Sequence, residues 1–432
     1  MRVSEWQSYA LGDLVGAAGG LIKTGPFGSQ LHAYEYTDDP GGVPVVMPKD
    51  MLNGRIARGS VSRVSETVAE RLHVHRLAAG DVVLARRGDV GRLAFVESDE
   101  AGWLCGTGSM RIHAPGHDVL DPQFLRYAMS APVVAEWFVG QAVGATMPNL
   151  NAKIVSGVPI STPGASTQRR IAAVLSAVDE LIEINERRIE LLEDLARSLY
   201  REWFVHFRFP GREDVELVDS ELGAIPEGWE VRPLGQVCSL LRSGGTPRRS
   251  VKANWDRGAT PWFKTGELTD GPLFDSLEHV TGASGARVFD PPAIFMAIYG
   301  APTVGRLGWV TQPSSCNQAA IAMRANNPER EQDWLWYELE AMRGHFNAMA
   351  QGAAQQNISK EKVEGTRVLV PAAVPLESFV AAVRPLRDLW EKLAAQVARF
   401  ATTRDLLLPR LVTGRLDISD IDLGILTPTE VE

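Results

Sequence analysis

Cysteine is scarce in this sequence of 432 residues, and the three that occur, Cys105, Cys238 and Cys316, are far apart. An odd number of distant cysteines supports neither a disulfide framework nor a zinc site, so we expect reduced, buried thiols. No run approaches the roughly 20 consecutive apolar residues of a membrane-spanning helix. The N-terminus also lacks the pattern of a signal peptide. The sequence therefore predicts a cytoplasmic protein that does not bind membranes.

Motifs for catalysis are also missing. There is no Gly-x-x-x-x-Gly-Lys-Ser/Thr phosphate loop, which excludes the usual ATP-driven motor, and no serine or cysteine nucleophile motif. A DNA adenine methyltransferase would need a Gly-rich cofactor turn and an Asn/Asp-Pro-Pro-aromatic loop. The nearest match, Asp290-Pro291-Pro292, is followed by Ala293, so we interpret it as a turn. We expect no catalytic site and no cofactor.

Two histidines could suggest a metal site. His73 and His75 alternate along a possible strand, so both side chains would lie on one face. No third ligand is placed near them, and a metal site needs at least three protein ligands. We therefore expect ordinary surface or DNA-facing histidines and no metal.

The net charge of −9 is unusual for a DNA-binding chain, because contacts to phosphate need lysine and arginine. The acidity is unevenly distributed, however. Residues 1–165 carry 14 basic and 16 acidic residues, and residues 229–371 carry 15 and 14, so each large segment is close to neutral. Near-neutral segments permit local basic faces.

An internal repeat of about half the chain indicates two copies of a domain and its connector. The repeat starts at Trp6 and again at Trp229. Its most specific match is a Val-Gly-Arg-Leu sequence that occurs at residues 90–93 and again at 304–307. Further on, residues 148–151 match 356–359 at a constant offset of 208, as do Gly157 and Gly365. Ordered matches of this kind predict a pseudo-two-fold duplication.

Each copy ends in a segment with the periodicity of a coiled coil. Between Thr167 and Trp203, apolar residues recur with seven-residue spacing, and Asn185 occupies one seam position. Residues 375–408 repeat the pattern at the offset of 208. Each apolar stripe needs a partner, and the other helix is the obvious one. The first helix would carry the chain from one head to the other, and the second, packed antiparallel, would carry it back.

Signals within the two heads are mixed. Apolar runs at 82–85, 93–96 and 293–298 predict strands, and the segments 122–139 and 334–349 look helical. We therefore expect an α+β fold, with two α/β heads joined by two long helices that form an antiparallel coiled coil. The expected boundaries are a first head at 1–165, a first helix at 166–207, a loop-rich linker at 208–228, a second head at 229–371, a second helix at 372–408 and a tail at 409–432.

This order of segments resembles the specificity subunits of type I restriction-modification enzymes, and the resemblance covers nearly the whole chain. The motifs that carry it are Leu11-Gly12-Asp13 with Thr24-Gly25-Pro26-Phe27-Gly28-Ser29, Trp255 with residues 262–268, Gln168-Arg169-Arg170-Ile171 at the start of the first helix, and residues 407–414 after the second. Each motif is weak alone, and the ordered set is strong.

The resemblance implies a subunit that recognises DNA without catalysing a reaction. In the family each head is a target-recognition domain that reads one half of a split DNA sequence. The helices act as a ruler and dock two copies of a DNA adenine methyltransferase subunit, and restriction and translocase subunits are further partners. Two different heads would read an asymmetric target of double-stranded DNA with an unread gap of about one duplex turn. Two alternatives stay open: a duplicated adaptor that does not recognise DNA, and a methyltransferase with a divergent site.

Basic residues beside turns are the candidate DNA contacts. In the second head six cations face only Asp256 across residues 242–264, which suits phosphate positioning and guanine readout. A solvated loop is the alternative reading. For Arg92 and Arg306 of the repeated motif, an internal salt bridge is as good an explanation, and amides such as Asn317 often cap local backbone. The full set is Lys23, Arg55, Arg58, Arg63, Arg92, Arg242, Arg248, Arg249, Lys252, Arg257, Lys264, Arg306, Asn317 and Gln318.

Apolar residues of the two long helices are the candidate subunit contacts. Trp203, close to Phe204, Phe207 and Phe209, makes the exit of the first helix strongly aromatic, which suits either core packing or a docking patch. The predicted contact set is Ile171, Leu192, Leu199, Trp203, Phe379, Trp390 and Phe400.

Overall fold

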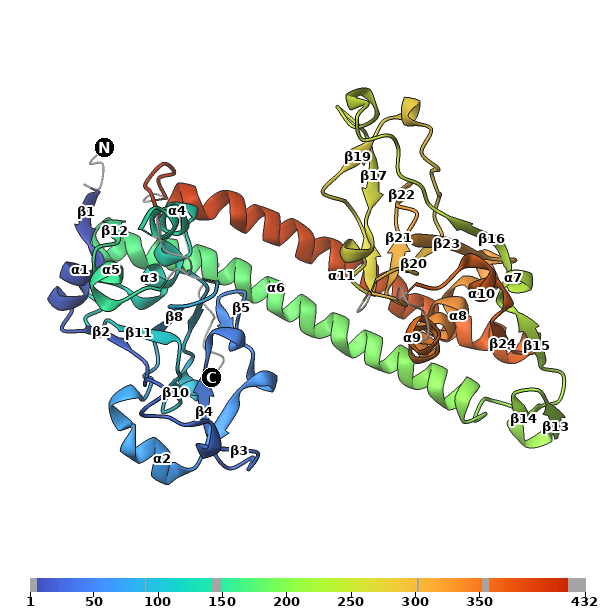
Figure 1. The fold of residues 1–432 in the computed structure, drawn as a ribbon, viewed down its shortest axis with the longest axis horizontal. Coiled ribbons are helices and arrows are strands. Elements are labelled where there is room, and N and C mark those ends of the chain that lie inside the picture. Colours follow the sequence, from blue (N-terminus) through green and yellow to red (C-terminus); the bar gives the residue numbers. More distant parts are fainter. Residues whose placement is uncertain (1–5, 90, 142–148, 301–302, 352–356, 419–432) are drawn as a thin grey trace, which may run out of the picture. The chain divides into compact units, whose positions relative to one another are not determined.

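The structure is a computed structural model that describes residues 6–89, 91–141, 149–300, 303–351 and 357–418. The chain divides into two compact units (Figure 1). Unit 1 comprises Met1–Ile182 and Arg399–Glu432, and unit 2 comprises Glu183–Ala398. Two long helices, α6 (Ala165–Tyr200) and α11 (Ala373–Leu411), each contribute to both units. Among the described residues, we find no helix with both the length and the apolar character needed to span a bilayer.

Unit 1 is a mixed α/β head with two four-stranded sheets, ordered β2-β11-β8-β9 and β10-β4-β7-β3, and a separate β1–β12 pair. Its strands are β1 (Gln7–Ala10), β2 (Leu21–Thr24), β3 (Tyr36–Thr37), β4 (Val43–Val46), β5 (Met51–Leu52), β6 (Arg55–Ile56), β7 (Ser62–Val64), β8 (Val82–Ala85), β9 (Leu93–Phe95), β10 (Leu104–Cys105), β11 (Ser109–His113) and β12 (Pro159–Thr162). Its short helices are α1 (Leu11–Ala17), α2 (Glu66–Arg71), α3 (Pro122–Met129), α4 (Pro132–Gln141) and α5 (Ala152–Ser156).

Unit 2 has the same design, with a five-stranded sheet β16-β23-β20-β21-β18, a three-stranded sheet β19-β17-β22 and a β15–β24 pair (Figure 1). Its strands are β13 (Leu217–Ser220), β14 (Gly223–Pro226), β15 (Glu230–Pro233), β16 (Cys238–Ser243), β17 (Thr260–Phe263), β18 (Gly271–Leu273), β19 (His279–Val280), β20 (Ala293–Ala297), β21 (Leu307–Val310), β22 (Ser315–Cys316), β23 (Ala320–Ala325) and β24 (Arg367–Val370). Its short helices are α7 (Leu234–Val237), α8 (Pro328–Ala341), α9 (Arg343–Gln351) and α10 (Lys360–Gly365).

The predicted duplication is present in the backbone. Strands β1 and β12 pair antiparallel in unit 1, as β15 and β24 do in unit 2. At the start of the helix after the first strand of each pair, the Leu11 N–H donates to the Val158 carbonyl and the Leu234 N–H to the Thr366 carbonyl, both at 2.8 Å. The two copies therefore share a folding plan as well as sequence matches. The matched residues 90, 148 and 356 lie outside the described residues.

The two long helices pack antiparallel, which confirms the prediction from their periodicity. In unit 2 the end of α6 meets the start of α11, where the rings of Tyr200 and Phe379 lie 6.3 Å apart. Nearer the middle of the helices, the Asn185 amide donates to the Gln396 side chain at 3.1 Å. An amide pair at a seam position fixes the register of two helices. In unit 1 the same α6–α11 packing buries Leu175 in one cluster with Leu411.

Three segments differ from the predictions. The linker expected to be loop-rich contains an antiparallel hairpin, β13 with β14. The second helix extends to Leu411, and in the described part of the expected tail Val412 and Ile418 are buried in the core of unit 1. Residues 419–432 lie outside the described part. The expected strand at His73–His75 is a 3-10 helix with His75 buried, so the two side chains do not share a strand face.

Glu338 is an acidic side chain that is buried in unit 2. Glu338 on α8 is 7 % exposed and accepts a hydrogen bond from the Tyr200 hydroxyl at 2.5 Å. Burial raises the pKa of Glu338 from its usual value of 4.5 to about 7, against the smaller opposing effect of the Tyr200 hydrogen bond. The carboxyl group is therefore protonated in the folded protein at a pH where it is ionised in the unfolded chain.

Glu338→Gln is expected to stabilise unit 2 at pH 8 and to change little at pH 4.5. A raised folded-state pKa gives stability that is complete below 4.5 and is lost as the pH rises through about 7. At pH 8 the substitution removes the free-energy cost of burying an ionisable carboxyl group, which is on the order of 3 kcal/mol. Thermal melts of both proteins at several pH values measure it, with Glu329→Gln, in the exposed first turn of the same helix, as the control. A gain that is independent of pH would contradict this role of Glu338.

Candidate nucleic-acid interface

A tight turn follows strand β2 in unit 1 and strand β16 in unit 2. Gly25 comes directly after β2, and a Cβ atom there would lie 2.1 Å from the Gly106 carbonyl oxygen. Gly244 comes directly after β16, and a Cβ atom there would lie 2.1 Å from the Cys316 carbonyl oxygen. Only glycine allows such an approach of two backbones. The Gly-Pro and Gly-Gly-Thr-Pro motifs of the sequence therefore occupy the same place in both heads.

A second turn lies beside the first in each head. The Arg86 N–H donates to the Gly108 carbonyl at 2.9 Å, and the Ile298 N–H donates to the Ala319 carbonyl at 2.8 Å. The arginines of the repeated motif pair back with the strand that precedes this turn, because the Ala85 N–H donates to the Arg92 carbonyl and the Ala297 N–H to the Arg306 carbonyl. A third segment of each unit joins the two turns.

The third segment is held to the second turn by one backbone hydrogen bond in each unit. The Leu150 N–H donates to the Arg86 carbonyl and the Ile358 N–H to the Ile298 carbonyl, both at 2.9 Å. These contacts define two equivalent groups of turns. We call residues 25–28, 86–88, 106–108 and 149–150 the turn cluster of unit 1. Residues 244–247, 298–300, 316–319 and 357–358 form the turn cluster of unit 2.

Amide side chains in the turn cluster of unit 2 are partly used within the fold. The Asn317 side-chain oxygen accepts from the Ala319 N–H at 3.1 Å, as an amide that caps local backbone does. The exposed Gln318 accepts a hydrogen bond from the Thr246 hydroxyl. Gln318 therefore stands at the surface of the cluster, whereas the Asn317 oxygen is occupied.

Two of the six cations predicted between residues 242 and 264 are neutralised by a carboxylate that lies outside this segment. Arg249 pairs with both oxygens of Glu278 at 2.8 and 2.9 Å, and Lys264 approaches the same group at 3.1 Å. These cations, above all Arg249, lower the pKa of Glu278 to about 2. The Arg249 guanidinium also lies over the rings of Trp255 and Trp262, at 4.0 and 4.8 Å from their centroids. Arg249 therefore has a structural role in this part of unit 2, and its contact with DNA stays a prediction.

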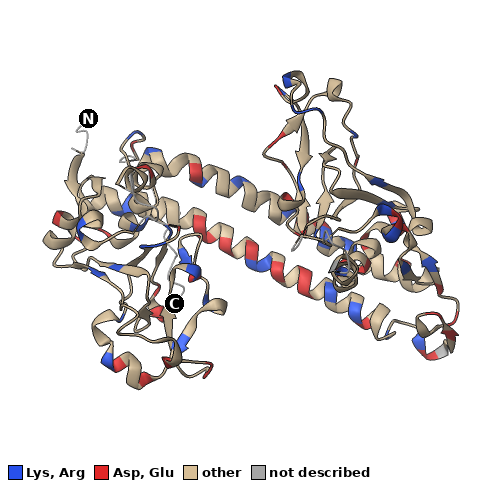
Figure 2. Ribbon diagram, viewed as in Figure 1, with Lys and Arg blue, Asp and Glu red and all other residues tan. Residues whose placement is uncertain are grey.

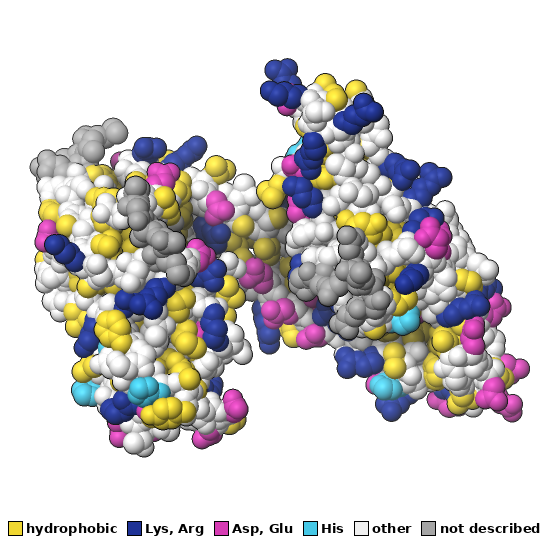
Figure 3. Space-filling model, viewed as in Figure 1, with side chains coloured by type: hydrophobic (Ala, Val, Ile, Leu, Met, Phe, Trp, Pro, Cys, Tyr) yellow, Lys and Arg dark blue, Asp and Glu magenta, His cyan; other side chains and the backbone are white. Residues whose placement is uncertain are grey.

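The other four cations of this segment are exposed. Arg242, Arg248, Lys252 and Arg257 form no ion pair with a carboxylate that the structure describes. Figure 2 shows basic positions on and beyond β16, and Figure 3 shows lysine and arginine side chains on the same part of the surface of unit 2. With Glu278 included, six cations face two carboxylates, which leaves an excess of four positive charges instead of five.

Most predicted cations of unit 1 have internal partners. Arg58 pairs with both oxygens of Asp99 at 2.6 and 2.7 Å and with Glu100 at 3.0 Å. Arg92 pairs with Asp89 at 2.7 Å, which is the internal salt bridge left open as the alternative. The Arg63 guanidinium donates to the Gly42 carbonyl at 2.7 Å. Arg55 is not free either, and Lys23 on β2 is half-buried. In unit 2, Arg306 beside β21 is half-buried as well. DNA contact by these residues stays a prediction.

Arg86 is a residue of the turn cluster of unit 1 that the sequence patterns do not single out. This side chain is 7 % exposed, its guanidinium lies 5.3 Å from the centre of the Phe27 ring, and Nη2 donates to the Asn149 side-chain oxygen at 3.2 Å. The two copies carry Ala85-Arg86-Arg87-Gly88 and Ala297-Ile298-Tyr299-Gly300 in the same frame. A comparison of the copies position by position would have shown that they differ where the backbone is shared.

Burial corrects part of the predicted subunit-contact set. Ile171, Phe379 and Trp390 are 1 %, 0 % and 6 % exposed, so they pack inside the chain and do not present a surface to a partner. Leu192, Leu199 and Trp203 are partly buried against the core of unit 2, and Phe400 is half-buried. The apolar residues that α6 exposes in unit 2 are instead Ile184, Leu191 and Leu195.

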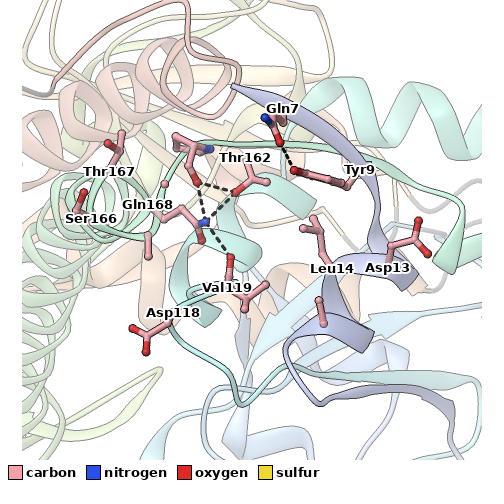
Figure 4. Close-up of a pocket in the computed structure, with 14 residues that line it drawn as sticks. Gln7, Tyr9, Asp13, Leu14, Asp118, Val119, Thr162, Ser166, Thr167 and Gln168 are labelled. Atoms are coloured by element: carbon pink, nitrogen blue, oxygen red, sulfur yellow. Dashed lines mark hydrogen bonds between the residues drawn. The ribbon is translucent and has the colours of Figure 1, made fainter. Parts of the chain in front are cut away.

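A hollow of about 750 Å³ lies in unit 1 where α6 begins (Figure 4). Gln168, 1 % exposed, closes one side of it: its amide donates to the Thr162 hydroxyl at 2.8 Å and to the Pro163 carbonyl at 2.9 Å. Its carbonyl accepts from the Asp121 N–H at 2.9 Å. Gln168 thus ties the head to the helix. In the described part of the chain, no group of three histidine, cysteine or acidic side chains is placed to hold a metal ion.

Comparisons with known proteins agree with this architecture. The family model described as type I restriction modification DNA specificity domain matches residues 3–194 and 226–374. The MjaIX specificity subunit of Methanocaldococcus jannaschii is 22% identical over 88% of each chain. The HindI specificity subunit of Haemophilus influenzae is 22% identical over 96% of this chain and 100% of its own. A crystal structure of the type I restriction-modification S subunit from M. genitalium has the same fold, with a TM-score of 0.62, 15% identity and coverage of 97% and 98% of the two chains.

Proposed function

This chain belongs to the type I restriction-modification DNA specificity family, and on that premise we propose that each of its two units reads one half of a split, asymmetric DNA target. The chain is a non-catalytic specificity subunit that works in a complex with other subunits. The observation that carries the two-reader proposal is the pair of turn clusters. Both have the same backbone contacts, yet one contains Phe27, Arg86 and Arg87 and the other contains Thr246, Ile298 and Tyr299 at the matching places.

A shared backbone with different side chains suits two readers of different sequence. Contacts to phosphate position a protein on DNA, and contacts to base edges specify the sequence. The exposed cations of unit 2 suit the first task, and the polar and aromatic side chains of the turn clusters suit the second. Because the two clusters differ in side chains, the two half-targets would differ as well, and the full target would be asymmetric.

Catalysis would come from partners that dock on the long helices. We assign this role to two copies of a DNA adenine methyltransferase subunit, with restriction and translocase subunits joining the complex. In unit 2 the exposed Ile184, Leu191 and Leu195 recur at intervals of seven and four along α6, on a flank beside the seam that is already filled by α11. Such spacing lets a partner helix pack along this flank of α6. A duplicated adaptor that does not recognise DNA is not favoured by the family.

Replacing Arg242, Arg248 and Lys252 by glutamine is expected to weaken DNA binding by the assembled complex at every sequence. Each phosphate contact adds about 0.9 to the slope of log K against log salt, so the slope should become shallower by up to about 3. Fluorescence titrations at several salt concentrations measure it. The matched control replaces Arg232, Arg330 and Arg367, which are ion-paired elsewhere on unit 2. An equal loss in both triple variants, or no salt-dependent binding by the wild-type complex, would contradict the proposal.

A further inference from the structure

Arg86 is a buried cation that has no anionic partner in the part of the chain that the structure describes. Its side chain is 93 % buried, and no carboxylate among the described residues pairs with it. Nη2 donates to Asn149, Nε is buried with no hydrogen-bond partner, and Nη1 has none among the described residues. Burial, and then the neighbouring charge of Arg87, lower the pKa of the guanidinium. A buried charge that lacks a partner costs free energy, so this site is incomplete as it stands.

The surroundings hold the guanidinium in one orientation. The Phe27 ring packs against the guanidinium and is itself 51% exposed, so the site lies next to the surface. The Asn149 side chain fixes Nη2 from a second segment. The Arg86 N–H donates to the Gly108 carbonyl and the Arg86 carbonyl accepts from the Leu150 N–H, so the backbone of Arg86 is fixed from two further sides. A planar guanidinium fixed in this way presents parallel donors to a planar acceptor pair, which a flexible surface cation does not.

The equivalent position of unit 2 carries no charge. Ile298 makes the same two backbone hydrogen bonds as Arg86, through Ala319 and Ile358, and its side chain is 2 % exposed among apolar neighbours. The fold therefore does not need an arginine at this position. Folding alone gives no reason to keep an unpaired cation in unit 1 where isoleucine serves in unit 2, so a ligand that supplies the missing acceptors is the simpler explanation.

We propose that Arg86 is a specificity-determining residue that reads a guanine in the half of the target bound by unit 1. Its guanidinium would donate to O6 and N7 of guanine in the major groove, with Phe27 and Asn149 as positioning residues. A fixed guanidinium can also bind phosphate. Contacts to phosphate carry no sequence information and would serve both units alike, whereas unit 2 has Ile298 at this position, so guanine is favoured. The inference rests on the proposed function and deepens it.

The test is the methylated motif of cells that express this chain with its methyltransferase subunits. Wild type, Arg86→Met and Arg86→Lys are compared by single-molecule sequencing of the methylated DNA. Both variants are expected to relax one G·C position in one half-target by about 5- to 150-fold, the range of a bidentate base contact, and to leave the other half unchanged. Arg71→Met, whose arginine pairs with Glu35 on the outside of unit 1, is the matched control and should keep the wild-type motif.

Each outcome decides the proposal. A wild-type split motif that stays unchanged in both Arg86 variants, with methylation reduced equally at all sites, would assign the residue to phosphate binding and overturn the proposal alone. Loss of methylation at every site in both variants would assign Arg86 to the folding of unit 1 and also overturn it. If the wild-type chain directs no split motif, the proposed function fails, and the proposal fails with it.

Discussion

Phe379→Ala is expected to lower the free energy of unfolding of unit 2 by about 3–5 kcal/mol, the range for truncating a large buried aromatic side chain. Phe379 is fully buried, and its ring contacts those of Trp203, Phe204 and Tyr337 at centroid distances of 5.9, 4.8 and 6.1 Å. It lies where the start of α11 meets the end of α6. The substitution therefore removes packing from the head and from the seam of the two helices together.

Urea titration followed by tryptophan fluorescence measures this effect, because most of the eleven tryptophans belong to unit 2. Leu389→Ala is the matched control. It lies on the same helix and is 45 % exposed, so its truncation should cost well under 1.5 kcal/mol. A similar loss of stability in the two variants would show that Phe379 is not part of a shared core.

Features encoded by local pattern were predictable from the sequence. The strand at Val82–Ala85 has the predicted bounds, and the apolar run at 293–298 forms β20, because short apolar runs bounded by glycine and aspartate carry their own signal. The two long helices follow from seven-residue spacing, and their antiparallel pairing follows from the need of each stripe for a partner. Asn185 even marks the seam, where it bonds to Gln396.

Features that depend on residues distant in sequence were not predictable. The hairpin β13–β14 forms in a segment whose glycines and prolines indicated a loop, because turn residues also serve hairpins. The short segment after α11 looks like a tail, yet Val412 and Ile418 fill a core built by the first head. A pattern within either segment cannot show which distant surface it covers.

The candidate interface shows the same limit in its charges. Glu278 is 29 residues from Arg249, and Asp99 is 41 residues from Arg58, so counting charges in a local window overestimates how many cations are free. Burial could not be predicted from the helix pattern either. Phe379 and Trp390 look like surface residues of an isolated helix, but the head of unit 2 covers them. The sequence located the turns of the interface through their glycines, and tertiary contacts decide which side chains remain available there.

The claim that each unit reads its own half-target has a direct structural test, because residues 229–371 form a closed segment. They begin and end on strands β15 and β24, which pair with each other through Glu230–Pro233 and Arg367–Val370. The segment of another family member can therefore be exchanged at these strands without breaking the pairing. Base contacts lie within the heads, so an exchanged head should carry its own sequence preference with it.

The measurement is single-molecule sequencing of methylated DNA from cells that express either the wild-type chain or the exchanged chain together with the methyltransferase subunits. We predict a split motif for the wild type, and for the exchanged chain a motif in which one half is replaced by a half-target of the donor while the other half is kept. A motif that is unchanged after the exchange, or one in which both halves change, would contradict two independent readers on one chain.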